Sequence, residues 1–173
     1  MDKLWSPWRS QYIDSFMDKH KEKGCIFCEI CKQDVNDPEN LLVEKGELTF
    51  TMLNLYPYNN GHLMVVPYKH KNEFQLLTDD ENAEIMEKLQ LAVKALKITM
   101  NAEGFNLGAN FGKASGAGID DHIHFHVVPR WNGDTNFMPV LGEVKVISQD
   151  LLLTKEKLVK AYSKIKQEIS SFR

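Results

Sequence analysis

The sequence predicts an α+β fold in which an antiparallel sheet carries helices on one side. Short segments of strand composition, separated by turn residues, outnumber the helical segments. Only one long helical pattern interrupts them, which favours an antiparallel sheet over alternating parallel strands and helices. A chain of 173 residues is long enough for one domain with a hydrophobic core. We therefore expect a single domain over 1–173, with an N-terminal extension (1–24) and a C-terminal helical extension (142–173).

The first half of the chain contains three predicted strands. Residues 41–44 (LLVE) and 47–54 (ELTFTMLN) surround Lys45-Gly46, and their β-branched and aromatic content predicts a hairpin. The turn-forming cluster LYPYNNG follows, in which Gly61 can adopt a positive φ angle. A third strand is expected over 62–67 (HLMVVP), ending at Pro67.

The second half begins with the longest predicted helix. Thr78 and Glu81 match a capping box, and apolar residues then recur at helical spacing. A strand over 105–111, a glycine-rich loop over 112–121 (GKASGAGIDD) and a strand over 122–129 (HIHFHVVP) follow. A second amphipathic helix is expected to begin near Thr154. The apolar stripes of the two helices consist of Ile85, Leu89, Ala92, Leu96 and Met100, and of Leu158, Tyr162, Ile165 and Ile169.

Composition limits the kinds of partner. There are 21 basic and 24 acidic residues, and the net charge of -3 argues against DNA while allowing a local phosphate site. No apolar run approaches the roughly 18 residues that span a bilayer, and the first residues lack the apolar core of a secretory signal. We therefore expect a cytoplasmic protein that binds neither DNA nor a membrane.

Half of the six histidines lie within five positions, in DHIHFHVVPRW. Successive side chains of a strand point to opposite faces, so His122, His124 and His126 are expected to share one face while the intervening apolar residues enter the core. This row has three interpretations. It is a polar sheet face, a set of three ligands for a catalytic metal with an open position for water, or a site for phosphate chemistry.

Phosphate chemistry is the interpretation that the surrounding sequence favours. Neutral imidazole, with an ordinary pKa of about 6.5, is a competent nucleophile at physiological pH and can form a covalent intermediate at phosphorus. The middle residue, His124, is the natural attacker. The loop at 112–118 offers backbone N–H groups and a hydroxyl to phosphoryl oxygens.

The stretch HIHFHVV fits the pattern His-φ-His-φ-His-φ-φ, where φ is apolar, and the glycine-rich loop precedes it. The segments LNLYPYNNGHLMVVPYKH, VVPRWNGDTNF and LWSPWR extend the match over residues 4–141. On these residues the sequence resembles the histidine triad (HIT) superfamily, in particular the bacterial branch that includes diadenosine tetraphosphate phosphorylases.

The resemblance implies a small α+β domain, with an antiparallel sheet, a long helix and a C-terminal helix, that forms a homodimer and binds a nucleotide or dinucleoside polyphosphate. By position, His124 attacks the α-phosphorus to give a nucleotidyl-histidine intermediate, and His126 donates hydrogen bonds to phosphate oxygens. Further substrate-binding positions implied by the resemblance are Asn54 at the ribose, Asn110, Ser115 and Gly116 along the phosphates, and His62 nearby. Taken alone, Asn54 and Asn110 are equally explained by hydrogen bonds of a turn or a strand edge.

The residues leave the acceptor open. Water makes the protein a hydrolase that releases a nucleoside monophosphate, and inorganic phosphate makes it a phosphorylase that releases a nucleoside diphosphate. The segments WNGDTNF and LWSPWR lean toward the phosphorylase branch. The alternative function is a nucleotide-binding sensor or scaffold without significant catalysis.

All three cysteines lie within CIFCEIC. Cys25 and Cys28 can supply two thiolates to a tetrahedral zinc, and the resemblance implies His70 and His122 as the other two ligands, which makes Zn²⁺ structural because no position is left for water. Reduced structural cysteines and a redox Cys-x-x-Cys are the alternatives; the second is disfavoured because no thioredoxin-like βαβ pattern surrounds it. Cys31 is then a spare thiol or a substitute ligand.

Several aromatic and basic residues are open to two interpretations. Trp5, Trp8 and Arg9 either cap a nucleotide or pin the N-terminal arm to the domain. Arg130 and Trp131 directly follow the histidine strand, where they either contact substrate or pack.

Overall fold

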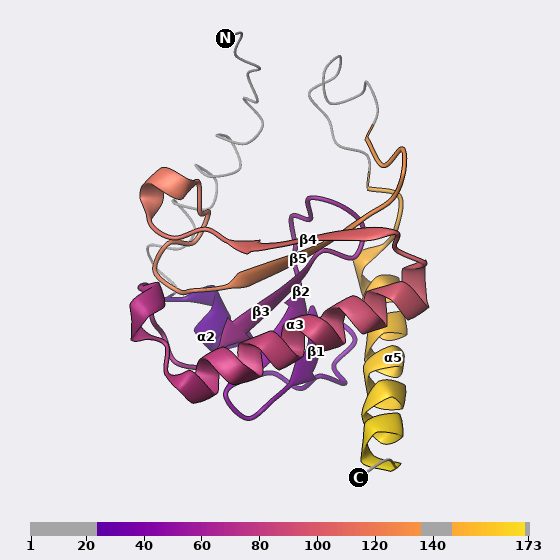
Figure 1. The fold of residues 1–173 in the computed structure, drawn as a ribbon, viewed down its shortest axis with the longest axis horizontal. Helices are drawn as coiled ribbons and strands as arrows, with labels where there is room; N and C mark the ends of the chain where they lie inside the picture. The colour runs from indigo at the N-terminus through magenta and orange to yellow at the C-terminus, as the bar shows by residue number, and fades with distance from the viewer. Residues whose placement is uncertain (1–23, 136–146, 172–173) are drawn as a thin grey trace, which may run out of the picture.

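A five-stranded antiparallel sheet with the strand order β1-β2-β3-β5-β4 forms the centre of the molecule. The computed structural model describes residues 24–135 and 147–171, so Trp5, Trp8 and Arg9 lie outside the described residues. The strands are β1 (Leu42–Lys45), β2 (Thr49–Leu53), β3 (Leu63–Pro67), β4 (Gly104–Ala109) and β5 (Phe125–Arg130). Figure 1 shows the sheet and the helices around it.

The two long helices cover one face of the sheet. They are α3 (Asp79–Met100) and α5 (Leu151–Ser171), and they cross each other in Figure 1. A short helix, α2 (Ile26–Ile30), covers the opposite face; the sequence did not predict it. Two 3-10 turns, η1 (Phe74–Leu76) and η2 (Lys113–Ser115), lie in the connections. The α+β prediction is therefore confirmed, with α2 as the exception to helices on one side.

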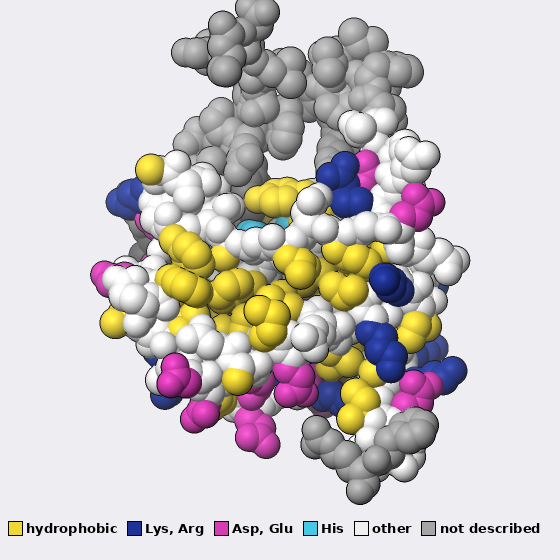
Figure 2. Space-filling view, viewed as in Figure 1, with side chains coloured by type: hydrophobic (Ala, Val, Ile, Leu, Met, Phe, Trp, Pro, Cys, Tyr) yellow, Lys and Arg dark blue, Asp and Glu magenta, His cyan; other side chains and the backbone are white. Residues whose placement is uncertain are grey.

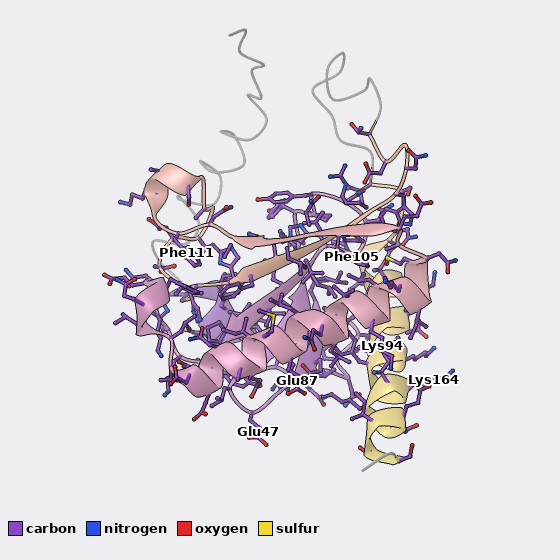
Figure 3. The ribbon with its side chains drawn as sticks, in the orientation of Figure 1. Glu47, Glu87, Lys94, Phe105, Phe111 and Lys164 are labelled. Atoms are coloured by element: carbon purple, nitrogen blue, oxygen red, sulfur yellow. The ribbon has the colours of Figure 1, made fainter. Side chains whose placement is uncertain are left out.

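Alternation along the strands separates two hydrophobic clusters. In β3, Leu63 and Val65 join the larger cluster with α3 and α5, whereas Met64 and Val66 join a smaller cluster beneath α2. Phe105 of β4 packs against the larger cluster and lies toward α3 in Figure 3. The face beneath α2 is the one that also carries histidines, because Met64 pairs with His126 across β3 and β5.

Both predicted helices form, but α5 begins earlier than expected and one residue of its predicted apolar stripe is exposed. The Thr78 capping box is present at the start of α3. α5 begins at Leu151 rather than near Thr154, because the Asp150 carboxylate accepts hydrogen bonds from two backbone N–H groups of its first turn. Ile169, predicted on the apolar stripe, is 46% exposed because it lies in the last turns, beyond the cluster that ends at Ile165. Neither of these helices is long and apolar enough to cross a membrane, within the described ranges.

The histidine strand differs from the prediction at both ends. β5 begins at Phe125 rather than His122, because the Ile123 N–H donates to the Lys71 carbonyl instead of a neighbouring strand. It continues through Pro129 to Arg130. The pairing with β3 ends at Val127, so the missing N–H of Pro129 removes no bond there. The expected extents of the single domain and its two extensions remain a prediction.

Candidate functional site

The three histidines lie on the face of the sheet beneath α2. Ile123 and Val127 belong to the larger cluster on the opposite face, as the alternation predicts. The Phe27 ring of α2 contacts two of the imidazoles, with centroids 5.4 Å from His122 and 5.0 Å from His124. The site is deeper than a solvent-exposed row, since all three histidines are buried. Figure 2 shows only a small patch of histidine surface in this view.

His124 presents a nitrogen lone pair. Its Nδ1 lies 2.9 Å from the backbone oxygen of His122, and a carbonyl can only accept, so Nδ1 carries the proton. Nε2 is then unprotonated in the neutral ring. The exposed fraction of His124 is only 6%, and this burial lowers its pKa below the ordinary value, which keeps the ring neutral near pH 7. The ring has the form that a nucleophile requires.

His126 has the opposite arrangement. The backbone N–H of Tyr58 donates to His62 Nδ1 at 3.0 Å, so His62 carries its proton on Nε2 and donates to His126 Nδ1 at 2.9 Å. The proton of neutral His126 is therefore on Nε2. That nitrogen is buried and has no hydrogen-bond partner in the described part of the chain. Burial, and then the nearby His124, lowers the pKa of His126 to about 4.

The two imidazoles are neighbours. Their centroids are 4.9 Å apart and the rings meet edge to face. A lone pair on His124 Nε2 thus lies beside a ring whose Nε2–H is available to donate. This pair can attack an electrophilic phosphorus and hydrogen-bond one of its oxygens.

The other predicted substrate-binding residues lie at different depths. Asn54 is half-buried just after β2; its side-chain oxygen accepts from the Tyr56 N–H at 3.0 Å, and its Nδ2 is 3.4 Å from His62 Nδ1. Asn110 is half-buried directly after β4. Ser115 is exposed in η2, where its hydroxyl donates to the carbonyl of Gly112. Gly116 ends that turn with a φ of 80°. The structure thus brings Asn54 and His62 to the triad, and their roles remain predictions.

The four predicted metal ligands converge. The candidate ligand atoms of Cys25, Cys28, His70 and His122 all lie within 4.8 Å of one another. His122 Nδ1 is 3.2 Å from the sulfur of Cys25 and 3.6 Å from that of Cys28, and His70 Nδ1 is 3.5 Å from Cys28. A tetrahedral zinc with bonds of about 2.3 Å to sulfur and 2.0 Å to nitrogen separates such atoms by about 3.5 Å. The donor set and its spacing therefore fit zinc.

The surroundings of this cluster also fit a metal. His122 Nε2 donates to the Pro67 carbonyl at 2.9 Å, which leaves Nδ1 unprotonated toward the sulfurs. Burial lowers the pKa of His122, which favours the neutral ring. Burial raises the pKa of the Cys25 thiol to about 11, so a cation is needed to hold it as thiolate. Cys31 lies outside the cluster, and its thiol donates to the Cys28 carbonyl.

Four residues around the site were not predicted from the sequence. Phe27 and Tyr58 contact the histidine rings, and Asn59 and Asp134 connect the loops beside them. The three-residue spacing of the cysteines was the available signal for α2 and Phe27. Arg130 pairs with Asp134, and the Trp131 indole donates to a backbone carbonyl, so both residues have structural contacts.

Known proteins resemble this chain in sequence and in fold. A model of the HIT domain matches residues 36–133. The chain is 40% identical over 169 residues to an AP-4-A phosphorylase of Mycobacterium tuberculosis, covering 95% of this chain and 86% of that protein. It is 28% identical over 151 residues to an adenosine 5'-monophosphoramidase of Candida albicans, covering 85% and 92%. A Zn-bound histidine triad family protein from Mycobacterium smegmatis superposes with a TM-score of 0.67 at 25% identity, covering 84% of this chain and 97% of that one. Since the matched region contains the histidine row and its glycine-rich loop, the chain belongs to the histidine triad (HIT) family.

Proposed function

We propose that this protein cleaves dinucleoside polyphosphates, with diadenosine tetraphosphate as the representative substrate, by transferring a nucleotidyl group through His124. The coarser function is that of a HIT-family nucleotide-processing enzyme, whose relatives are a phosphorylase and a phosphoramidase. The observation that carries the proposal is the different Nδ1 partners of two adjacent rings, from which we infer a lone pair on His124 Nε2 and a proton on His126 Nε2.

The first step forms the intermediate. The lone pair of His124 Nε2 attacks the α-phosphorus, a P–N bond forms, and the P–O bond to the remaining polyphosphate breaks with its electron pair on the leaving oxygen. His126 Nε2–H donates to a non-bridging oxygen as negative charge increases there. The His124 Nδ1–H bond to the His122 carbonyl stabilises the positive charge that the ring acquires.

The second step releases the nucleotide. An oxygen of the acceptor attacks phosphorus, the P–N bond breaks, and its electron pair returns to His124 Nε2. Inorganic phosphate as the acceptor gives a nucleoside diphosphate, and water gives a monophosphate. The 40% identity to an AP-4-A phosphorylase supports phosphate. Asn54 contacts the ribose, and Asn110, Ser115 and Gly116 contact the phosphates.

Product analysis tests this function. Incubation of diadenosine tetraphosphate with inorganic phosphate is expected to yield ADP. Mass spectrometry of a short incubation without added phosphate, before water releases the nucleotide, is expected to find AMP on His124. His124→Ala is expected to abolish turnover and to keep nucleotide binding, while Glu156→Gln, on the exposed side of α5, serves as a control. Full activity of His124→Ala would refute the mechanism. Binding without any product favours the sensor or scaffold.

We also propose that Cys25, Cys28, His70 and His122 hold a structural Zn²⁺. When bound, the ion joins the start of α2 to the segments after β3 and before β5, and it supplies crosslinking rather than a reactive water. The thiolates need a reducing compartment, so the cytoplasm is part of this proposal. Elemental analysis is expected to find about one zinc per chain, and chelation or Cys28→Ser is expected to lower the melting temperature. Metal-free protein with an unchanged melting temperature contradicts the site.

A homodimer completes the proposal. β4 is an edge strand whose outer residues are exposed, and hydrophobic side chains gather between β4 and α3 in Figure 2. Leu107 of β4 and Ile98 of α3 are among the exposed hydrophobic residues. Such a face is typical of an interface between subunits. Light scattering is expected to give twice the chain mass, and Leu107→Lys is expected to shift the protein toward the monomer. A monomeric wild-type protein contradicts this part.

A further inference from the structure

The Asp134 carboxylate ties together segments that are distant in the sequence. Its Oδ2 accepts from Arg130 Nε at 2.5 Å, from Asn59 Nδ2 at 2.8 Å and from the Trp131 N–H at 3.2 Å. Its Oδ1 accepts from Arg130 Nη2 at 2.8 Å. The carboxylate is buried although Arg130 itself is exposed. The Arg130 pair lowers the pKa of Asp134 to about 2, so the group is ionised at every working pH.

Asn59 joins this carboxylate to the turn beside His62. The amide is buried, and its Nδ2 donates to both the Asp134 carboxylate and the Pro129 carbonyl, while its Oδ1 accepts from the Asn60 N–H. The backbone oxygen of Asn59 accepts from the His62 N–H at 3.2 Å. An amide held in this way cannot rotate, because a flip directs its oxygen at the carboxylate and at a carbonyl.

The same turn determines which nitrogen of His62 carries the proton. The Tyr58 N–H, directly before Asn59, donates to His62 Nδ1 and therefore leaves the proton on Nε2. The His62 Nε2–H donates to Nδ1 of His126, which must therefore present its lone pair and leave the proton of the neutral ring on His126 Nε2. If the turn shifts, His62 can protonate Nδ1 and accept on Nε2; His126 then donates from Nδ1 and its Nε2 becomes a lone pair.

We infer that Asp134 is a positioning residue, which acts through Asn59 on the turn 58–62 and so keeps His126 as a hydrogen-bond donor toward the reacting phosphoryl group. Its effect on turnover rests on the proposed function, but its effect on the tautomers does not. Arg130 orients the carboxylate from the outside and also donates to Asn106 of β4, which fixes it to the sheet.

Asp134→Asn and Asn59→Ala test the connection. Long-range ¹H–¹⁵N spectra of the imidazoles report the tautomers directly, with His126→Gln used to assign the signals. We expect a proton on Nε2 of His126 in the wild type and a mixture of tautomers in both variants. We expect kcat to fall by about 10- to 100-fold in each, with KM little changed. Because both act on one path, the double variant should be no slower than the slower single variant.

The control is Glu156→Gln, which breaks another ion pair four residues apart, on the exposed face of α5, and should change neither the spectrum nor kcat. Wild-type tautomers in folded Asp134→Asn overturn the inference, as do losses in kcat that multiply in the double variant. If Asp134→Asn does not fold, Asn59→Ala alone decides, since it removes the link and leaves the Arg130 pair. A wild type that releases no nucleotide refutes the proposed function, and the spectra still decide the role of Asp134.

Discussion

Replacement of Gly61 tests whether the turn before His62 is fixed by both its backbone and its packing. Gly61 has a φ of +73°, a region that costs an L-residue about 1 to 2 kcal/mol. A Cβ there would also lie 2.5 Å from Met100 Sδ and 3.0 Å from Leu96 Cδ2. Met100 can rotate partly away, but Leu96 is fully buried in the larger cluster, so overpacking adds about 1 to 2 kcal/mol. Gly61→Ala is therefore expected to lower the free energy of unfolding by about 2 to 4 kcal/mol.

Gly133→Ala provides the matched comparison. Gly133 has a φ of +78° in the turn that the Asp134 N–H closes on the Trp131 carbonyl, and no atom lies within 4 Å of its ideal Cβ. This variant should therefore lose only the backbone part, about 1 to 2 kcal/mol. Urea denaturation of both variants measures the two losses, and their difference is the steric contribution of α3. Equal losses would refute the conclusion that α3 packs closely against this turn.

Two further predictions concern buried charge. His126 has a pKa of about 4 in the folded protein and an ordinary value near 6.5, so the unfolded chain binds a proton between these values that the folded chain does not. The free energy of unfolding is then expected to fall by up to about 3 kcal/mol as the pH drops from 6.5 to 4. Urea titrations at several pH values measure this dependence. A weaker pH dependence in His126→Gln confirms that His126 causes it, and an equal dependence in both proteins excludes that cause. Among the described residues, Lys88→Met leaves the buried Glu44 paired only with Lys166, and it is expected to lower the free energy of unfolding by about 3 kcal/mol. Lys160→Met, in an exposed pair with Glu156, should lower it by less than about 0.5 kcal/mol. Similar losses in the two lysine variants would argue against the buried pair.

Local signals predicted the regular elements well. The Thr78 capping box and the apolar period of α3 are properties of neighbouring residues, and both are confirmed. The hairpin around Lys45-Gly46 is confirmed for the same reason. The ends of β5 differ from the prediction because contacts with distant parts of the chain determine them. The Ile123 N–H donates to the Lys71 carbonyl rather than to β3, and Pro129 lies beyond the end of the pairing with β3.

In the candidate site, too, contiguous sequence patterns were predictable and contacts between distant residues were not. The histidine row and the glycine-rich loop are contiguous in the sequence, and the spacing of Cys25 and Cys28 indicated two thiolate ligands. The resemblance to a family added His70 and His122 as the other two ligands, and the structure brings all four together. The contact between Asp134 and Asn59 could not be predicted from the sequence, because the two residues lie in different loops that come together only when the strands pair. A single aspartate and a single asparagine in turns carry no signal of their own.

The three histidines of the row differ in protonation pattern because their Nδ1 atoms meet different partners. Nδ1 of His122 faces two cysteine sulfurs, that of His124 donates to a carbonyl, and that of His126 accepts from His62. Since neutral imidazole carries one proton, each Nδ1 partner determines the state of Nε2: protonated on His122, where it donates to Pro67, unprotonated on His124, and protonated again on His126. Identical side chains at alternate positions can thus take the three roles that we propose: a zinc ligand, a nucleophile and a hydrogen-bond donor. The backbone carbonyl of His122 orients the next histidine of the row, so any change that displaces the cysteine cluster also acts on the lone pair of His124.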